Sequence, residues 1–346
     1  MKKIDTSKLK KGDVILTTSI EPLSGKIRAL TDSDISHAMI YVSDGSVMDS
    51  TSEGVQARNI QKMFYPDECA IHVLRLKATL TSADAKKIVN YVRSETGAPY
   101  SRLEAARSIL NPTSSGGQNQ FCSRLVARAY QCVGINLTDN PNFATPAQIQ
   151  NSDLLEPVPG AVLDATEEDQ RALEVMGDTT EQMRDVTDRL LQKIRTITKE
   201  ARVVNDLPSL LVKNPKWDKK FLAAYKSSGY LEYWKVDVER FPWRYDYTEM
   251  VRFYHAIGDK AWLIKYCHDT VRQNHDGDYD HWKGNLEAHR QLYRQNPRLK
   301  TLGQLLLLYH ELDSHRVKRL ANAERLLLDF ANSAPTGNEP TIAKHP

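Results

Sequence analysis

Short apolar runs separated by turn residues dominate the first part of the chain. Four of them are rich in Val, Ile and Thr: DVILTT (13–18), AMIYV (38–42), SVMDS (46–50) and AIHVLRL (70–76). Runs of this length and composition predict β-strands. The stretch SDGS at 43–46 predicts a tight hairpin turn that joins the second and third strands in antiparallel order.

Two later stretches of the same part follow the helical period. The first covers about 83–95, with Thr81 or Ser82 as its N-cap. The second begins near Cys122 and is ended by Gly134, a residue type that is common just after helices. Its apolar positions recur at the spacing of one buried helical face: Leu125, Val126, Ala129, Tyr130 and Val133. An α+β fold, with a small antiparallel sheet packed on helices, is therefore predicted.

The pattern changes near residue 160. PVPG (157–160) is typical of a linker, and after it apolar residues recur every three or four positions. We expect one long amphipathic helix over 167–201 and further helices to about 332. The final residues are polar and contain proline, which predicts disorder. The chain is thus expected to hold an α+β domain over 1–160, an all-α domain of unknown role over 161–332, and a disordered tail over 333–346.

Composition and charge narrow the classes of protein. The 346 residues are 40% hydrophobic and 26% charged, with a net charge of +3, which is ordinary for a globular protein and gives no footprint for nucleic acid. The opening MKKIDTSKLKKGDVILTTS has no apolar core of a secretory signal, and no run suits a membrane-spanning helix. We expect a cytoplasmic protein without stable membrane insertion, while export by a signal-independent secretion system stays open.

Cysteine chemistry is the first candidate for a function. Cys122 falls in the first turn of its helix, where free N–H groups and the helix dipole favour a thiolate. The alternative is a small buried apolar residue, which is how we interpret Cys69, Cys132 and Cys267 in their apolar surroundings. The four cysteines form no CxxC pair, which argues against a disulfide framework or a zinc site.

A nucleophilic cysteine needs a base and a group that orients the base. Only His37 and His72 lie in the first 160 residues. His72 lies within a strand run and is interpreted as structural, whereas His37 stands at the start of a strand. Pairing across the predicted turn places residues 40 and 49 opposite each other, so His37 and Asp49 become diagonal neighbours. The strand register then decides whether they touch.

Five segments together resemble a known family. GDVILTTS, SHAMIYVSDGSVMDS, GAPYS, FCSRLVARAYQCVGI and ATPAQIQNS are similar in kind and order to the signatures of circularly permuted NlpC-like cysteine hydrolases. These enzymes belong to the papain-like superfamily, include YiiX- and YaeF-type proteins, and have lecithin:retinol acyltransferases as relatives. The resemblance covers about residues 10–155 and leaves the helical half unexplained.

The resemblance implies a catalytic triad. Cys122 would be the nucleophile, His37 the general base and Asp49 the residue that orients the imidazole. Because many members of the family carry glutamate at the third position, Ser50 or Glu53 is an alternative to Asp49.

Three further residues are candidates for the cleft. The Cys122 backbone N–H would hold the oxyanion, with the Gln120 side chain as a second donor. Tyr41 and Tyr100 fall where the family lines its cleft, with simple packing as the alternative.

These roles imply a cysteine hydrolase that works through a thioester without a cofactor. NHDGDYDHW (274–282) resembles a calcium loop only loosely, since it has no closing glutamate, so no metal is expected. The favoured substrate is an amide bond in a peptidoglycan stem peptide, which would make the protein an exported antibacterial effector whose helical domain binds an immunity or secretion partner. The alternatives are a lipid-directed thiol hydrolase or acyltransferase, a deamidase-type toxin, and a non-catalytic interaction module.

Overall fold

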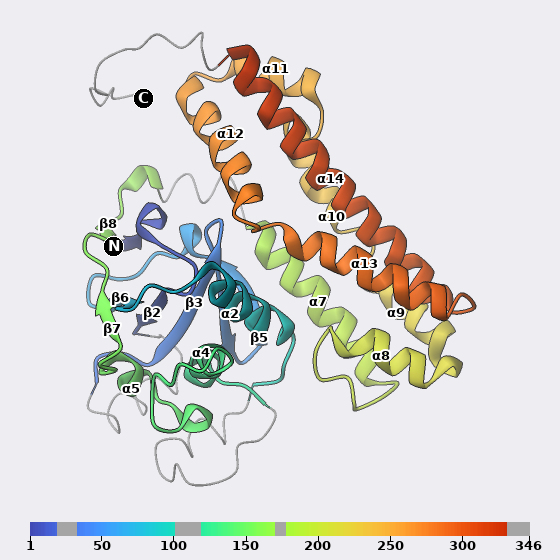
Figure 1. The fold of residues 1–346 in the computed structure, drawn as a ribbon, viewed down its shortest axis with the longest axis horizontal. Helices are drawn as coiled ribbons and strands as arrows, with labels where there is room; N and C mark the ends of the chain where they lie inside the picture. The colour runs from blue at the N-terminus through green and yellow to red at the C-terminus, as the bar shows by residue number, and fades with distance from the viewer. Residues whose placement is uncertain (19–32, 101–118, 170–177, 331–346) are drawn as a thin grey trace. The chain divides into compact units, whose positions relative to one another are not determined.

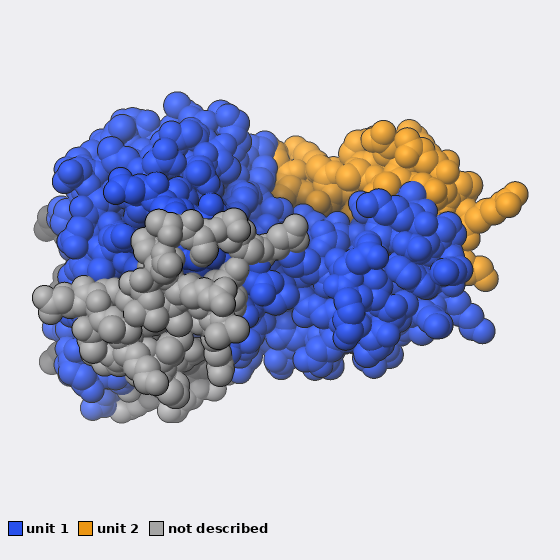
Figure 2. Space-filling view, turned by 90° about the horizontal axis from the view of Figure 1, so that it is seen from below, with its two compact units in different colours: residues 1–230 blue, residues 231–346 orange. Residues whose placement is uncertain are grey.

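The protein forms two compact units, residues 1–230 and residues 231–346, which Figure 2 shows in two colours. The computed structural model describes residues 1–18, 33–100, 119–169 and 178–330. The predicted disordered tail, 333–346, lies outside the described residues.

An antiparallel sheet is the centre of the first unit (Figure 1). In the described part of the chain it has six strands in the order β5-β4-β3-β2-β6-β7. They are β2 (Val14–Thr17), β3 (His37–Ser43), β4 (Ser46–Thr51), β5 (Gly54–Asn59), β6 (Ile71–Leu76) and β7 (Leu155–Pro157). The short strands β1 (Lys2–Ile4) and β8 (Val162–Asp164) pair with each other. All four predicted strands are present, whereas β1, β5, β7 and β8 were not predicted.

Helices α2 (Ser82–Ser94) and α4 (Cys122–Gln131) confirm the two helices predicted from the first part of the chain. Thr81 is the N-cap of α2, where its hydroxyl accepts a hydrogen bond from the Asp84 N–H. The apolar face of α4 packs on the sheet in a buried cluster that includes Leu125 and Val126 of the helix with Ile40 and Met48 of the strands. The short helix α5 (Pro146–Gln150) follows.

Residues 178–230 belong to this same compact unit. The α+β domain was predicted to end at residue 160. It holds α7 (Thr179–Arg195), α8 (Asp206–Lys213) and α9 (Asp218–Ser228). Helix α7 contacts the edge strand β5 and buries Val186, Leu190, Leu191 and Ile194. Together with the backbone of Gly97 and Ala98, which forms hydrogen bonds with Val55, α7 covers this edge of the sheet.

The single helix expected over 167–201 is not formed. Asp178 is the extended N-cap of α7, with φ −118° and ψ 101°, so a helix cannot pass through it. Its carboxylate accepts a hydrogen bond from the Thr180 N–H, and the helix ends at Arg195. The apolar spacing of this stretch indicated helix correctly, but an Asp that caps the backbone N–H groups interrupts it.

The second unit is helical in its described residues. It consists of α10 (Trp234–Arg240), α11 (Tyr247–Ala256), α12 (Lys260–His275), α13 (Asp280–Gln295) and α14 (Lys300–Phe330). Helix α14 packs along α12 and α13, and its Ala323 and Leu326 share a buried cluster with Trp243, Met250 and Cys267. This confirms the predicted helical C-terminal region. Across the described residues, every helix is too short or too polar to cross a membrane.

Candidate active site

A hairpin with a β-bulge places the imidazole and the carboxylate of the candidate site. Asp44 and Gly45 form the predicted two-residue turn with positive φ angles of 49° and 69°, which match the twist of a hairpin. Ser43 pairs with Ser46, as predicted, but the register then shifts by one residue between Tyr41 and Ser43. A bulge of this kind is common beside active sites, where it redirects side chains.

The bulge corrects the predicted register. Ile40 pairs with Met48 rather than with Asp49. In the predicted register Asp49 would lie on the opposite face from His37, because side chains alternate along a strand. In the observed register Asp49 is diagonal to His37 on the same face, and His37 Nε2 lies 3.2 Å from Asp49 Oδ2.

Helix α4 brings Cys122 to this pair. Its N-cap is Phe121, which has no side-chain acceptor for the first N–H groups of the helix. That leaves this end of the helix without a side-chain cap and favourable for negative charge. Cys122 is buried, with 6% of its surface exposed, and its Sγ lies 4.0 Å from the Ser36 carbonyl oxygen, next to His37 in the chain.

The charge state of His37 links the three residues. Burial lowers the pKa of His37, but hydrogen bonds with Asp49 and Cys122, together with the negative charge of both, outweigh it and raise the pKa to about 10. His37 is therefore imidazolium at neutral pH. The structure thus brings together the three residues that the sequence singled out for a triad.

Arg58 is a residue of this site that the sequence reasoning missed. It lies on β5, and its Nε donates to Asp49 Oδ2 at 2.8 Å. Strand β5 was missed because its sequence, GVQARN, is half polar. Asp49, with 1% of its surface exposed, is a buried carboxylate that requires a cation, and that requirement is the signal that would have pointed to an arginine.

Gln120 is held by a second carboxylate. Its Nε2 donates to Glu95 Oε2 at 2.8 Å, and Glu95 is also bound by Arg202 through two hydrogen bonds of 2.7 and 2.9 Å. This contact anchors the segment just before Cys122 to the end of α2. The role of Gln120 as a donor to an oxyanion stays a prediction.

The other predicted cleft residues have mixed surroundings. Tyr41 is buried in an apolar cluster and its hydroxyl accepts a hydrogen bond from the Gly45 N–H, which favours the packing alternative. Tyr100 is partly exposed and pairs with the backbone of Gln120. Of the alternatives to Asp49, Ser50 is buried, and Glu53 receives a hydrogen bond from Arg58.

The remaining cysteines and the histidines of the described residues have ordinary surroundings. Cys69 and Cys267 are buried as predicted, but Cys132, at the end of α4, is exposed. His72 is partly exposed and lies 3.3 Å from Asp34. Within the described segments, His, Cys, Asp and Glu do not form any group of three or more that could hold a metal ion.

A cysteine at the start of a helix, packed on an antiparallel sheet that carries a histidine, defines a papain-like arrangement in which the histidine precedes the cysteine. Residues 8–155 match the family of permuted papain-like amidases known as YaeF/YiiX, the C92 family.

Individual relatives cover similar stretches. The probable lipoprotein peptidase YaeF of Escherichia coli (strain K12) is 31% identical over 145 residues, which are 39% of this chain and 52% of that protein. The chain thus spans about half the length of this curated relative. The crystal structure of metalloprotein yiiX from Escherichia coli O157:H7 aligns with a TM-score of 0.37 at 18% identity, over 44% of this chain and 97% of that chain.

Proposed function

We propose that the protein is a cysteine hydrolase that cleaves amide bonds with Cys122 as nucleophile, His37 as acid and base, and Asp49 as the residue that orients His37. The observation that carries the proposal is the coupling of the three side chains. The 3.2 Å contact joins His37 to Asp49, and the pKa of His37 rises to about 10 because burial is outweighed by Asp49 and Cys122. The match of residues 8–155 to an amidase family supports it.

The reaction follows from these positions. Because His37 Nε2 faces Asp49, the other ring nitrogen, Nδ1, is the one that exchanges a proton with Cys122. The thiolate attacks the amide carbon, and the oxyanion is held by the N–H groups at the start of α4. His37 gives its proton to the leaving amine, which leaves a thioester on Cys122. Water then attacks the thioester, His37 takes its proton, and release of the acid restores the thiolate.

The proposed substrate class is a peptide, with peptidoglycan stem peptides as the favoured members. A relative with 31% identity is described as a probable peptidase, which supports a peptide amide over a lipid ester. The chemistry on Cys122 is the same for both, so the leaving group has to be determined by experiment.

The test is product analysis by mass spectrometry. Purified peptidoglycan and mixed phospholipid vesicles are incubated in parallel with the wild type, Cys122→Ala and Cys132→Ala. Cys132 is an exposed thiol outside the site and serves as the matched control. We expect new stem-peptide fragments with the wild type and Cys132→Ala only. Release of fatty acid that depends on Cys122 would show that the substrate is a lipid. Equal products from wild type and Cys122→Ala would refute the proposal.

A further inference from the structure

Arg58 is bound so that its position is determined from three sides. Nε donates to Asp49 Oδ2 at 2.8 Å, while Nη2 donates to Thr51 Oγ1 at 3.0 Å and to Glu53 Oε2 at 2.9 Å. Only 19% of the Arg58 side chain is exposed. A guanidinium has its donors in a rigid plane, so two anchored nitrogens fix the third.

The oxygen that Arg58 binds is the one that His37 binds. Asp49 Oδ2 lies 3.2 Å from His37 Nε2 and 2.8 Å from Arg58 Nε. The other oxygen, Oδ1, is buried and has no hydrogen-bond partner within the part of the chain that the structure describes. Asp49 Oδ2 therefore binds both His37 and Arg58. Because the oxygen is shared, a movement of Arg58 changes the position and the effective charge of the carboxylate beside His37.

We propose that Arg58 is a positioning residue of this site, which fixes the Asp49 oxygen for His37 and offsets part of its negative charge. The inference rests on the proposed function and deepens it. Without Arg58 the full charge of a buried carboxylate would act on the imidazolium. His37 would then hold its proton more tightly and protonate the leaving amine more slowly.

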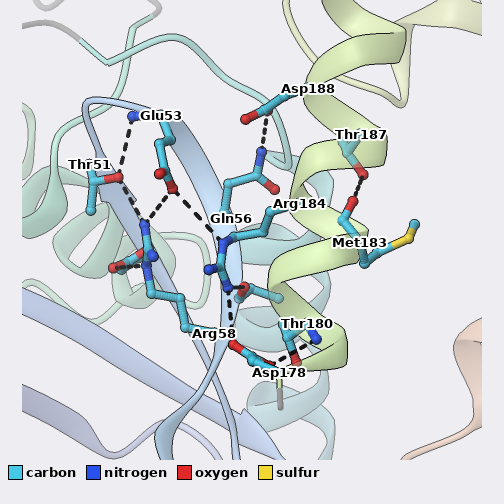
Figure 3. A network of polar contacts seen from close by, with 12 residues as sticks. Thr51, Glu53, Gln56, Arg58, Asp178, Thr180, Met183, Arg184, Thr187 and Asp188 are labelled. Atoms are coloured by element: carbon cyan, nitrogen blue, oxygen red, sulfur yellow. Dashed lines mark hydrogen bonds and ion pairs between the residues drawn. The ribbon is translucent and has the colours of Figure 1, made fainter. Parts of the chain in front are cut away.

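The network extends to a helix outside the family match. Arg184 of α7 approaches the same Glu53 oxygen at 3.9 Å, its Nη1 lies 3.7 Å from Asp178, and it donates to the Ala57 carbonyl of β5. Figure 3 shows these side chains between β5 and α7, with Glu53 between the two arginines. By holding Glu53, α7 supports the outer anchor of Arg58.

The charge state of His37 is the readout, because a purely structural role of Arg58 would not move it. Histidine labelled with ¹³C at Cε1 gives an NMR signal for each ring, and the His37 signal is the one lost in His37→Gln. At pH 10 about half of His37 in the wild type is imidazolium, because the pKa of His37 is about 10. Coulomb's law for charges ~5 Å apart predicts a rise of about half to two pH units when Arg58 is replaced by Met.

We therefore expect Arg58→Met to raise the ratio of imidazolium to imidazole at pH 10 by about tenfold, which is about one pH unit. Arg75→Met is the matched control, because Arg75 of β6 likewise binds a buried carboxylate, that of Asp13, through hydrogen bonds of 2.6 and 2.8 Å, and that carboxylate is not a partner of His37. It should leave the His37 ratio unchanged. An unchanged or lower ratio in folded Arg58→Met overturns the proposal.

A second variant keeps the test valid if Arg58→Met fails to fold. Glu53 is half exposed, so Glu53→Gln should fold. This substitution leaves Asp49 as the one carboxylate that Arg58 binds and removes a negative charge, so the ratio should fall by about twofold, the opposite direction. A ratio that stays or rises overturns the proposal. The NMR readout needs no substrate, so a wild type that makes no product would refute the proposed function without affecting this result.

Discussion

Gly97 lies where the end of α2 meets α7, and a methyl group has no room there. Its φ is +83°, and an added Cβ would lie 2.1 Å from Leu191 Cδ1. Leu191 is 1% exposed, so it cannot turn away into solvent. The Gly97 carbonyl also accepts a hydrogen bond from Arg195 at 2.8 Å. Gly97→Ala therefore combines backbone strain with a clash.

The variant Gly134→Ala serves as a control, because it has the backbone strain without the clash. Its φ is +80°, almost the same, but an added Cβ would meet nothing within 4 Å. Left-handed backbone costs about 1–2 kcal/mol for alanine, and overpacking a buried position costs about 1–3 kcal/mol more. The gain from a less flexible unfolded chain is common to both variants. We expect Gly97→Ala to lose ~1–3 kcal/mol more stability than Gly134→Ala.

The free energy of unfolding of the first unit is measured in urea, with hydrogen exchange of a peptide that covers β6 as the readout. In a Leu191→Ala background the clash partner is gone, so the two glycine variants should then cost the same. Equal losses in the wild-type background would refute the reasoning, because they would show that α7 does not pack against Gly97.

Three further results are expected. Asp49→Asn removes a negative charge that raises the pKa of His37, so the alkaline limit of activity should move below pH 10 and turnover should fall about 100-fold, measured as a pH profile. Burial, with the charge of nearby Glu53, raises the pKa of Asp188 to about 6, so its charge destabilises the fold above pH 6. Asp188→Asn should thus be ~1–2 kcal/mol more stable than wild type at pH 8, a gain that disappears at pH 4. Glu95→Gln should lose ~1–2 kcal/mol through its contact with the partly exposed Arg202, measured by urea unfolding; no loss would show that this ion pair does not anchor the site.

The sequence pointed to the three site residues because each stands at a recognisable place in its element. Cys122 begins a helix with a clear apolar face, and His37 and Asp49 lie on two strands joined by a two-residue turn. What the sequence could not supply was the bulge beside Tyr41. A bulge depends on how the strand fits its neighbours on both sides, and an apolar run gives no sign of it.

The role of Arg58 and the contact between β5 and α7 were not predicted, for a different physical reason. Strand β5 is an edge strand whose polar side chains bind α7, as Gln56 does when it donates to Asp188 at 2.7 Å. Its two apolar residues, Val55 and Ala57, do alternate with Gln56 and Arg58, but one of them is alanine and the run is too short to stand out as a strand. The α7 residues that bind β5 lie more than 120 positions away, so no local pattern predicts this contact.

The contact between β5 and α7 also explains why the domain does not end at the predicted linker, residues 157–160. The family match stops at residue 155, yet the outer side of β5 is covered by α7, and the carboxylate that anchors Arg58 meets Arg184. Glu95, which holds Gln120 just before Cys122, is likewise bound by Arg202. Two ion pairs thus connect the segment after 178 to the two sides of the site, one behind Asp49 and one before Cys122. A chain shortened to the matched residues would keep all three candidate catalytic side chains and lose the cations that hold their supports.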